Sequence, residues 1–590
     1  MTTQHTEFHF SPRPNRANEI AWREWSDDAF ERAKREDKPI LLAISAVWCH
    51  WCHVMDETSY SQPSIIGLIN ERYVPVRVDN DRRPDVNARY NQGGWPTTAF
   101  LTPDGSLLAG ATYLPPEQMQ GALEQVADFY KNNRAEIEKR SVELTGRTRQ
   151  YDVADPSALN KDMISRVMRE IEDNYDAEYG GFGTAPKFPM VDVLELLLQE
   201  YRAAGEQRYY DMLAHTLFGM TDGGMYDHVE GGFFRYSTTR DWSVPHFEKM
   251  TEDHAGLLRV LAALTRTTRN DRFRGTLISA LEYIRTVLRD PQTGLFAGSQ
   301  DADEEYYALP LEERRARQAP YVDRTSYSNW TAAIAGAFMR SADALDDDRL
   351  GAEGEATLDT LHDRLRDADG LLFHFIEPGG SPQVRGLLTD QAAYLRALLD
   401  AHEFGGQPRF LTRARELAAA IERHFSAEDG GFYDHASLEQ TLGSLTLRDR
   451  PLADNALLAE SFLRLAVLEL EPRYREVAQH ALLLYAKTYE GAGMFAAPYA
   501  RALRRYLTPA ASVALVGSVA KTSSLREAAH NLPEAILCVG TIDPGDLRTL
   551  AKRGFDPALH PVAYFCREER CAAPALTAAD LRGAYEALTA

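Results

Sequence analysis

The sequence predicts a multidomain protein in which two α/β regions flank an all-α region. Three observations lead to this prediction. Strand and helix patterns alternate over residues 1–150, a glycine-aromatic turn recurs between long helical patterns over residues 160–505, and short apolar strands return over residues 506–590. A chain of 590 residues is also too long for one hydrophobic core.

The N-terminal region shows strands and helices in the alternation expected for a central sheet flanked by helices. The continuous apolar run at residues 39–45 is typical of a strand that is buried on both faces. The other expected elements are helices at 27–36, 54–60 and 64–71, strands at 73–78 and 94–101, and a turn at 102–105.

Two cysteines, Cys49 and Cys52, lie one helical turn apart directly after this first strand. Free N–H groups and the helix dipole stabilise a thiolate at the start of a helix. Cys49 would then attack a disulfide, and Cys52 would resolve the mixed disulfide. Pro96, which follows Trp95, is expected in the cis form beside the pair, where it shapes the substrate groove of thioredoxin folds. We therefore predict a thioredoxin-like domain with a redox-active disulfide.

Other interpretations of the same motif stay open. Cys49-His50-Trp51-Cys52-His53 matches the attachment pattern of c-type haem, which needs an exported chain. Zinc or copper could bind Cys49 and Cys52 together with His50 or His53, because nitrogen and sulfur ligands suit both metals. The thioredoxin-like fold could also be retained in a protein whose two cysteines do not undergo catalytic turnover. Redox-active thiols are the preferred interpretation, and no cofactor is predicted.

Long helical patterns dominate the middle region, at residues 191–203, 255–268, 276–289, 390–404 and 455–470. The recurring turn places phenylalanines at positions 182, 233, 296, 373, 432 and 495, with intervals of 51, 63, 77, 59 and 63 residues. Each interval has the length of a helical hairpin with its loops, and repeated hairpins must stack to bury their apolar faces. Six hairpins can close into a ring. We therefore predict an (α/α)6 barrel, with an open helical solenoid as the alternative.

The densest polar cluster of this region suits a carbohydrate pocket, because its aromatic residues alternate with acids and histidines. Hydrolysis of a glycosidic bond needs two carboxylates on either side of the bond. The candidates for these carboxylates are Glu248, Asp253, Asp301 and Asp303. Epimerisation beside a carbonyl would instead use histidines as acid and base, with His228, His246 and His254 as candidates. Polar residues that only lock the barrel end are the alternative.

Two sets of site residues follow from these arguments. The predicted catalytic residues are Cys49, Cys52, Pro96, His246, Glu248 and Asp253. The predicted substrate-binding residues are Trp95, Lys187, Tyr226, Asp227, His228, Arg235, Tyr236, Trp242, Asp301 and Asp303.

The C-terminal region shows strand patterns at 513–517, 535–539 and 562–565 and helical patterns at 524–531 and 578–588. It is expected to form a small α/β appendage or to extend the first sheet. Cys566 and Cys571 could form a disulfide, hold a metal, pass electrons to Cys52 or stay as free thiols.

The composition of the chain limits the partners that it is expected to bind and the compartment in which it is expected to act. The net charge of −22 argues against duplex nucleic acid, whose phosphates need clustered lysine and arginine. No apolar run reaches the roughly 18–20 residues that cross a bilayer, and residues 1–10 have no signal-peptide pattern. Five cysteines are too few for a disulfide scaffold. We expect a cytoplasmic protein with no nucleic-acid or membrane partner.

Several motifs resemble those of the thioredoxin-domain family typified by spermatogenesis-associated protein twenty. The matching segments are 49–55, 83–85, 93–96, 100–105, 186–189, 235–236, 245–250, 301–303 and 563–566, with Cys571 beyond them. The resemblance implies a thioredoxin-like domain fused to a barrel similar to six-hairpin glycosidases and N-acylglucosamine epimerases. It implies no settled activity.

The chain departs from this family pattern at two places. The segment between Asp85 and Gly93 is shorter than in relatives, so the helix before the cis-proline loop is expected to be trimmed. Residues 251–254 read Thr-Glu-Asp-His, where relatives carry Leu-Tyr-Asp-Asn. The second change places additional ionisable groups beside the expected barrel site.

The leading hypothesis is a thiol–disulfide protein fused to a barrel that binds or processes a sugar-like molecule. Its expected partners are a thiol or disulfide protein and a sugar-like small molecule. The second hypothesis makes the barrel a glycosidase or epimerase with a regulatory thioredoxin-like domain. The third is a non-catalytic scaffold or metal-binding protein.

Overall fold

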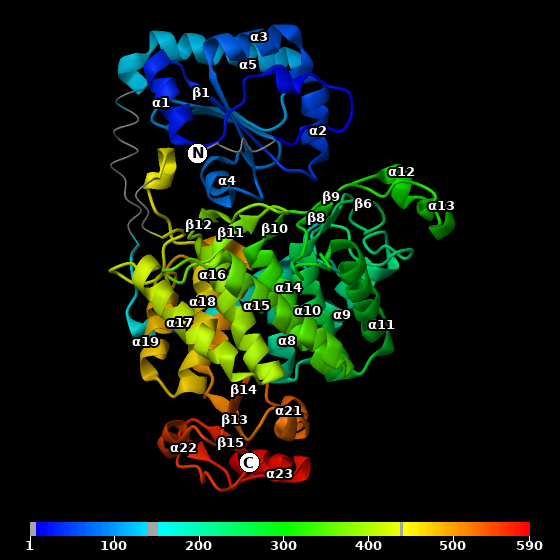
Figure 1. The fold of residues 1–590 in the computed structure, drawn as a ribbon, viewed down its shortest axis with the longest axis vertical. Coiled ribbons are helices and arrows are strands. Elements are labelled where there is room, and N and C mark those ends of the chain that lie inside the picture. Colours follow the sequence, from blue (N-terminus) through cyan, green and yellow to red (C-terminus); the bar gives the residue numbers. More distant parts are fainter. Residues whose placement is uncertain (1–7, 138, 140–150, 437–440, 590) are drawn as a thin grey trace. The chain divides into compact units, whose positions relative to one another are not determined.

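The computed structural model describes residues 8–137, 139, 151–436 and 441–589, and it divides into two compact units (Figure 1). The first unit comprises Met1–Gln150 and Ser437–Asp449, and the second comprises Tyr151–Ala436 and Arg450–Ala590. The first unit therefore contains a segment from the second half of the chain. The predicted domain boundary at residue 150 and residues 1–7 lie outside the described residues.

The sheet of the first unit has the strand order β2-β1-β3-β4. Strand β1 pairs in parallel with β2 and antiparallel with β3, which pairs antiparallel with β4. The strands are β1 (Ile40–Ser45), β2 (Val74–Asp79), β3 (Thr97–Leu101) and β4 (Leu107–Ala111). The helices are α1 (Asp27–Glu36), α2 (His50–Glu57), α3 (Pro63–Arg72), α4 (Pro84–Tyr90) and α5 (Pro116–Asn132).

Both faces of this sheet are covered, as the continuous apolar pattern of β1 predicts. Successive side chains of a strand point to opposite faces. Ile40, Leu42 and Ile44 accordingly join one core cluster, whereas Leu41 and Ala43 join the other. Helix α4, which precedes the cis-proline loop, has seven residues.

Six helices of the described residues form a closed inner ring in the second unit. Each packs against the next, and the last of them packs against the first. In ring order they are α8 (Val191–Ala204), α10 (Thr251–Thr268), α14 (Ser328–Leu345), α16 (Leu388–Asp400), α18 (Leu452–Glu469) and α20 (Ala497–Leu507). Closure excludes the open solenoid and confirms the predicted (α/α)6 barrel.

An outer helix packs against every member of the inner ring. The outer helices are α9 (Gln207–Asp222), α11 (Asp271–Tyr283), α15 (Asp348–Leu365), α17 (Pro408–Phe425), α19 (Pro472–Leu483) and α7 (Lys161–Asn174). Two π-helical segments extend the helices, at Ile284–Leu288 and Ala401–Gly405. Short 3-10 helices occur at Ala17–Glu19, Ser59–Ser61, Pro156–Ala158, Gly443–Thr446, Tyr489–Ala496 and Ala520–Thr522.

Each outer helix leads through a glycine-aromatic turn into the N-terminus of an inner helix, so these turns gather at one end of the barrel. Figure 1 shows short strands over this end. They are β5 (Tyr236–Ser237), β6 (Pro245–His246), β7 (Lys249–Met250), β8 (Ser299–Gln300), β9 (Val322–Asp323), β10 (Ser326–Tyr327), β11 (Phe373–Ile376) and β12 (Gln383–Arg385). The same end carries the short helices α12 (Glu304–Tyr307) and α13 (Leu311–Arg315). We call it the turn end.

One glycine shows why the turns need that residue. Gly181 has a φ of +78°, and a Cβ atom there would lie 2.3 Å from the Trp242 ring. A side chain at this position would therefore have both an unfavourable backbone conformation and a steric clash.

The C-terminal region forms its own sheet within the second unit, so it does not extend the first sheet. Its strand order is β14-β13-β15-β16, with β13 parallel to β14 and antiparallel to β15. The strands are β13 (Ala511–Val516), β14 (Leu537–Ile542), β15 (Val562–Arg567) and β16 (Arg570–Cys571), and the helices are α21 (Ser523–His530), α22 (Leu547–Arg553) and α23 (Ala578–Thr589).

This order and these strand directions repeat those of the N-terminal sheet. A cis peptide precedes the third strand in both sheets, at Trp95-Pro96 and at His560-Pro561. The C-terminal region thus has the strand topology of a second thioredoxin-like sheet, without cysteines at the start of its first helix. The sheet lies at the end of the barrel opposite the turn end (Figure 1).

No described helix is both long enough and apolar enough to span a membrane.

Candidate functional site

The cysteine pair of the N-terminal unit lies at the start of helix α2, where the sequence predicts it. Cys49 is the N-cap residue, and it forms a disulfide with Cys52. The backbone N–H of Cys52 donates to Sγ of Cys49 at 3.2 Å. This N–H and the helix dipole favour negative charge on Sγ of Cys49 once the disulfide is reduced.

The loop that contains the cis-proline is held against the loop before Cys49. The rings of Trp48 and Trp95 meet edge to face at 5.6 Å between centroids. Trp48 Nε1 donates to Asp81 Oδ2 at 2.7 Å, and Trp95 Nε1 donates to Asn87 Oδ1 at 3.1 Å. These contacts place the cis Trp95-Pro96 peptide in the same neighbourhood as the cysteine pair.

The residues between the two cysteines are the accessible part of the motif. Trp51 is 52% exposed, and His50 is exposed beside it. Cys49 and Cys52 are themselves buried. The Trp51 ring packs against Tyr113 at 5.2 Å, so an exposed aromatic surface borders the disulfide.

The next turn of α2 is polar and buried. Asp56 and Arg77 form an ion pair at 2.8 Å. Burial lowers the pKa of His53 to about 4, and His9 adds to this effect. His53 is therefore neutral near pH 7 and adds no positive charge to the thiol site. Among the described residues, no group of three or more His, Cys, Asp or Glu side chains is placed to hold a metal ion.

At the turn end of the barrel, several predicted binding residues hold the turns together. Lys187 is fully buried, and its Nζ donates to Asp176 Oδ2 at 2.6 Å and to the Gly180 carbonyl at 2.7 Å. Lys249 repeats this arrangement with Asp227 at 2.7 Å and the carbonyl of Gly231 at 2.8 Å. Lys187 and Asp227 thus have structural contacts, and the site described below does not include them.

Three further predicted residues lie around these turns. Trp242 is fully buried, and its Nε1 donates to the carbonyl of Tyr179 at 3.0 Å. Tyr226 is buried beside Phe233. His228 is exposed, and its ring lies 5.4 Å from that of Tyr226.

Other predicted residues meet in one polar cluster. His246 Nδ1 and Glu248 Oε2 are 2.5 Å apart, and Glu248 is 1% exposed. The Tyr236 ring stacks at 4.9 Å on His246 and at 4.9 Å on Phe188. The backbone N–H of Arg235 donates to the Glu248 carbonyl at 2.9 Å. The result is a histidine–carboxylate pair beside a stack of aromatic rings.

Carboxyl groups with raised pKa values border this cluster. Burial raises the pKa of Asp253 to about 7, with contributions from Glu252 and Glu248 and an opposing effect of Arg235. Burial likewise raises the pKa of Asp301 to about 7. The backbone N–H of Ala302 opposes that rise, whereas Glu248 and Asp303 add to it. Asp303 itself caps helix α12 by accepting from the N–H of Tyr306. Asp253 and Asp301 can therefore act as proton donors near neutral pH.

Three inner helices carry an aspartate at the same position, and the sequence pattern predicts only Asp253 of these as a site residue. Asp253, Asp390 and Asp454 are the third residues of α10, α16 and α18. Burial raises the pKa of Asp454 to about 7, and Asp390 adds to the rise. His374 Nδ1 lies 2.9 Å from Asp390 Oδ1, which forms a second histidine–carboxylate pair. The three aspartates follow Phe233, Phe373 and Phe432 at unequal spacings of 20, 17 and 22 residues, so the repeat of the turns alone does not reveal the series.

In α10 and α18, the residue after this aspartate forms a hydrogen bond with the glycine-aromatic turn that precedes the helix. His254 Nε2 accepts from the N–H of Phe233 at 2.8 Å, and its Nδ1 lies 2.6 Å from the carbonyl of Met250. In α18, Asn455 Oδ1 accepts from the N–H of Phe432 at 2.7 Å. His254 therefore takes the place of an asparagine, and both of its nitrogens are engaged by the backbone.

The remaining cysteines fall into a disulfide and a free thiol. Cys566 and Cys571 are bonded across β15 and β16, so the structure selects the disulfide among the possibilities raised by the sequence. Cys566 is buried and Cys571 is exposed. Cys538 is free, and burial raises the pKa of its thiol to about 11.

Comparisons with known proteins agree with this geometry for the N-terminal unit. Residues 11–148 match the family model Thioredox_DsbH, described as a protein of unknown function, DUF255. The chain is 36% identical over 311 residues to spermatogenesis-associated protein 20 of Rattus norvegicus. This match covers 48% of the chain and 39% of the rat protein. The predicted family resemblance is thereby confirmed.

Two further similarities concern single parts of the chain. A stretch of 81 residues is 28% identical to the thiol:disulfide interchange protein DsbD of Pseudomonas fluorescens, covering 13% of this chain and 14% of that protein. The cellobiose 2-epimerase of Spirochaeta thermophila aligns with a TM-score of 0.49 and 17% identity, over 60% of this chain and 95% of that chain.

Proposed function

We propose that the N-terminal unit exchanges disulfides with a partner protein through Cys49 and Cys52. The observation that carries this proposal is the Cys49–Cys52 disulfide at the N-terminus of α2, with the N–H of Cys52 directed at Sγ of Cys49. The name of the DsbD relative, a thiol:disulfide interchange protein, supports it.

The exchange uses two thiols and one disulfide. In the reduced protein, the Cys49 thiolate attacks one sulfur of the partner disulfide and expels the other sulfur as a thiolate. The Cys52 thiol then loses its proton, attacks Sγ of Cys49 and releases the second partner sulfur. The partner gains two electrons and two protons, and the Cys49–Cys52 disulfide is formed again.

The surroundings of the pair suit an extended protein substrate. Trp51 offers an exposed aromatic ring next to the disulfide. This exposed ring favours a polypeptide over a small thiol as the partner. A cytoplasmic site of action stays a prediction from the sequence.

Insulin reduction with dithiothreitol tests this function. The wild type should accelerate the reduction, and Cys49→Ser should abolish the acceleration. Cys538→Ser is the matched control, because it changes the buried free thiol of the other unit. Wild-type activity of Cys49→Ser would refute the role of Cys49.

We infer a second function for the turn end of the barrel, the binding and processing of a sugar-like molecule. The specific observation is a pair of histidine–carboxylate contacts, His246–Glu248 and His374–Asp390, together with the raised pKa values of Asp253 and Asp301. A histidine oriented by a carboxylate is an arrangement for proton transfer. This favours isomerisation or epimerisation beside a carbonyl over hydrolysis.

Thermal-shift measurements with a panel of mono- and disaccharides should identify a ligand that raises Tm. The same sugar, incubated with the protein in D2O, should exchange the hydrogen on the carbon beside its carbonyl, which NMR detects. Glu248→Gln should abolish this exchange, whereas Glu178→Gln, an exposed surface change, should leave it intact. Release of a free monosaccharide without exchange would identify a hydrolase instead.

A further inference from the structure

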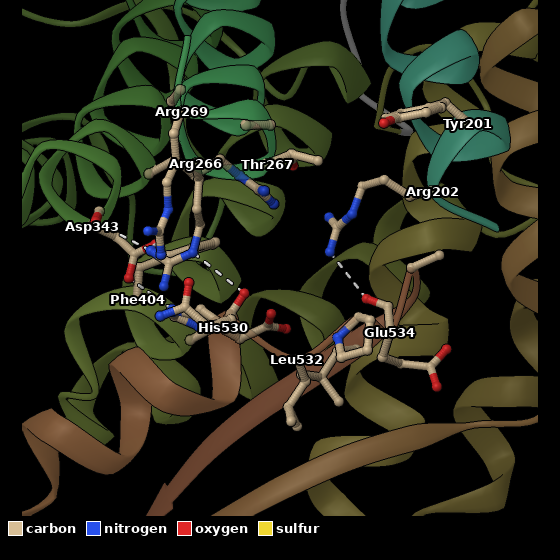
Figure 2. Close-up of a pocket in the computed structure, with 18 of the residues that line it drawn as sticks. Tyr201, Arg202, Arg266, Thr267, Arg269, Asp343, Phe404, His530, Leu532 and Glu534 are labelled. Carbon is tan, nitrogen blue, oxygen red and sulfur yellow. Dashed lines mark hydrogen bonds and ion pairs between the residues drawn. The ribbon is translucent and has the colours of Figure 1, made fainter. Parts of the chain in front are cut away.

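A cavity with a volume of about 720 Å³ lies at the end of the barrel where the inner helices finish. The C-terminal ends of inner helices contribute to its wall, and residues 530–535 and Leu537 of the C-terminal region complete it (Figure 2). The cavity is thus separate from the turn end, where the helices begin. Its size is within the usual range for small-molecule sites.

Arginine side chains dominate this cavity. Those that line it are Arg202, Arg266, Arg269, Arg340, Arg464 and Arg505. The carboxylate residues of the lining are Asp343, Glu403 and Glu534, so positive charge exceeds negative charge by three among the described lining residues. The whole chain carries a net charge of −22, which makes this local excess a property of the site.

The carboxylates of the lining are already engaged. Asp343 binds Arg266 and also accepts from His530 at 2.8 Å. Glu403 pairs with Arg464 at 3.0 Å. The carboxylate of Glu534 pairs with Arg567, which is outside the lining. Asp400, which is outside the lining, pairs with Arg340 at 2.9 Å and with Arg464 at 2.8 Å. Among the described lining residues, the guanidinium groups left without a carboxylate are therefore those of Arg202 and Arg269.

Arg202 and Arg269 have no ion-pair partner among the described residues. Arg202 extends from α8 toward the C-terminal region, where its Nη2 donates to the backbone carbonyl of Glu534 at 3.0 Å (Figure 2). Burial and the nearby charges of Arg340 and Arg266 lower the pKa of Arg202. An anion between these groups would remove that repulsion.

A further unsatisfied donor belongs to the same wall. Nε of Arg505 is buried and has no hydrogen-bond partner. Its Nη1 contacts only the weakly accepting Sγ of Cys538, at 3.6 Å, and Glu460 is 3.9 Å away. Positive charge is favoured near helix C-termini, which explains why arginines occur at this end of the barrel. This interaction does not supply a hydrogen-bond acceptor for the guanidinium group of Arg505.

We propose that this cavity binds a small organic phosphate. Guanidinium groups bind phosphate oxygens through paired hydrogen bonds, and the convergence of several of them suits a dianion. Phe404 and Tyr201 in the same lining offer apolar surface for the organic part of the ligand.

Binding to the full-length protein tests the proposal by thermal shift and calorimetry at constant ionic strength. The probes are inorganic phosphate, glucose 6-phosphate, ADP and citrate, with chloride as the reference. A phosphate ester should raise Tm and bind more tightly than inorganic phosphate and citrate. A preference for ADP over glucose 6-phosphate, or the reverse, identifies the organic part.

Variants distinguish ligand binding in the cavity from a general effect of the protein's net charge. Arg202→Gln should weaken binding at least tenfold, and Arg202→Lys should weaken it less, because it retains the charge but loses the paired donors. Arg582→Gln is the control, since it removes an equal charge from the exposed face of α23. Equal affinity of Arg202→Gln and Arg582→Gln, tighter binding of citrate, or no response to any phosphate would overturn the proposal. The Tm of each variant without ligand shows whether the variant folds. If Arg202→Gln does not fold, Arg269→Gln provides the second test.

Discussion

At the level of single residues, the function proposed for the turn end depends on carboxyl groups whose pKa is raised by burial. Asp253 shows the effect, because its pKa in the folded protein is about 7. In an unfolded chain the same group ionises at about 3.9. Between these two values the folded protein binds the additional proton.

The sign of the pH dependence follows from this difference. Since the folded state binds more protons between about pH 4 and 7, the free energy of unfolding falls as the pH rises through this window, and the loss is complete above about pH 7. Asp253→Asn cannot lose a proton. We therefore expect the Tm of the wild type to fall more steeply than that of Asp253→Asn between about pH 5 and 8.

Asp241→Asn is the control for this measurement. Hydrogen bonds from Ser243 and Thr239 lower the pKa of Asp241 to about 2, so its titration is complete below the window. Its Tm should follow the wild type between about pH 5 and 8. Parallel curves for the wild type and Asp253→Asn would contradict the raised pKa.

At the level of elements, the barrel repeats one design in which a side chain of the first helical turn holds the preceding loop. His254 does this in α10, and Asn455 does it in α18. Loss of the His254 side chain would leave the N–H of Phe233 unsatisfied in a buried position. Such a group costs about 1–3 kcal/mol.

Two substitutions at position 254 distinguish the stabilisation by the hydrogen bond from the stabilisation by packing of the imidazole ring. His254→Ala should lower the free energy of unfolding by about 2 kcal/mol. His254→Asn should recover much of this loss, because asparagine already makes the equivalent bond in α18. Chemical denaturation measures both values. Equal destabilisation by the two variants would show that the ring packing, and not the hydrogen bond, matters.

The sequence predicts most elements and the start of α8 at Val191, but it starts some of the inner helices too late. Helix α10 was expected from residue 255 and begins at Thr251, and α18 was expected from 455 and begins at Leu452. The apolar period detects only the part of a helix that packs in the core. The first turn of these two helices is polar, so Asp253 and Asp454 lie outside the apolar pattern, whereas Asp390 lies inside the predicted helix 390–404.

Other features had no sequence signal of their own. Asp390 and His374 lie in different elements, and only the folded chain brings them together. The topology of the C-terminal sheet was hidden because its first helix lacks the cysteine motif that made the N-terminal fold recognisable. By contrast, Cys49, Cys52 and Pro96 were predicted because their local sequence contains the strand, the helix start and the proline.

At the level of the whole molecule, the two units are linked by more than one passage of the chain. The loop between α17 and α18 supplies residues to the N-terminal unit, where Leu445 is 4% exposed within the core that includes Trp25 and Tyr90. The backbone N–H of Ser444 donates to the Tyr90 hydroxyl at 2.7 Å. The thioredoxin-like unit is therefore completed by a segment of the barrel sequence.

Truncation of this leucine should weaken the N-terminal unit. Leu445→Ala removes buried methyl groups, so we expect a loss of roughly 3 kcal/mol in the free energy of unfolding of that unit. Trp25 fluorescence contributes to the signal, and protection of the N-terminal unit from proteolysis gives a separate readout. Leu447→Ala, at a 37% exposed position of the same segment, should change little. Equal behaviour of the two variants would show that Leu445 adds nothing to this core.

The central claim is that Cys49 is an activated thiol at the start of α2. The most direct test is the pH dependence of its alkylation in the reduced Cys52→Ser protein, followed by mass spectrometry of the peptide that contains Cys49. The account predicts a thiol pKa clearly below the ~8.5 of an ordinary cysteine, because the helix start stabilises the thiolate. A pKa at or above ~8.5 would contradict it.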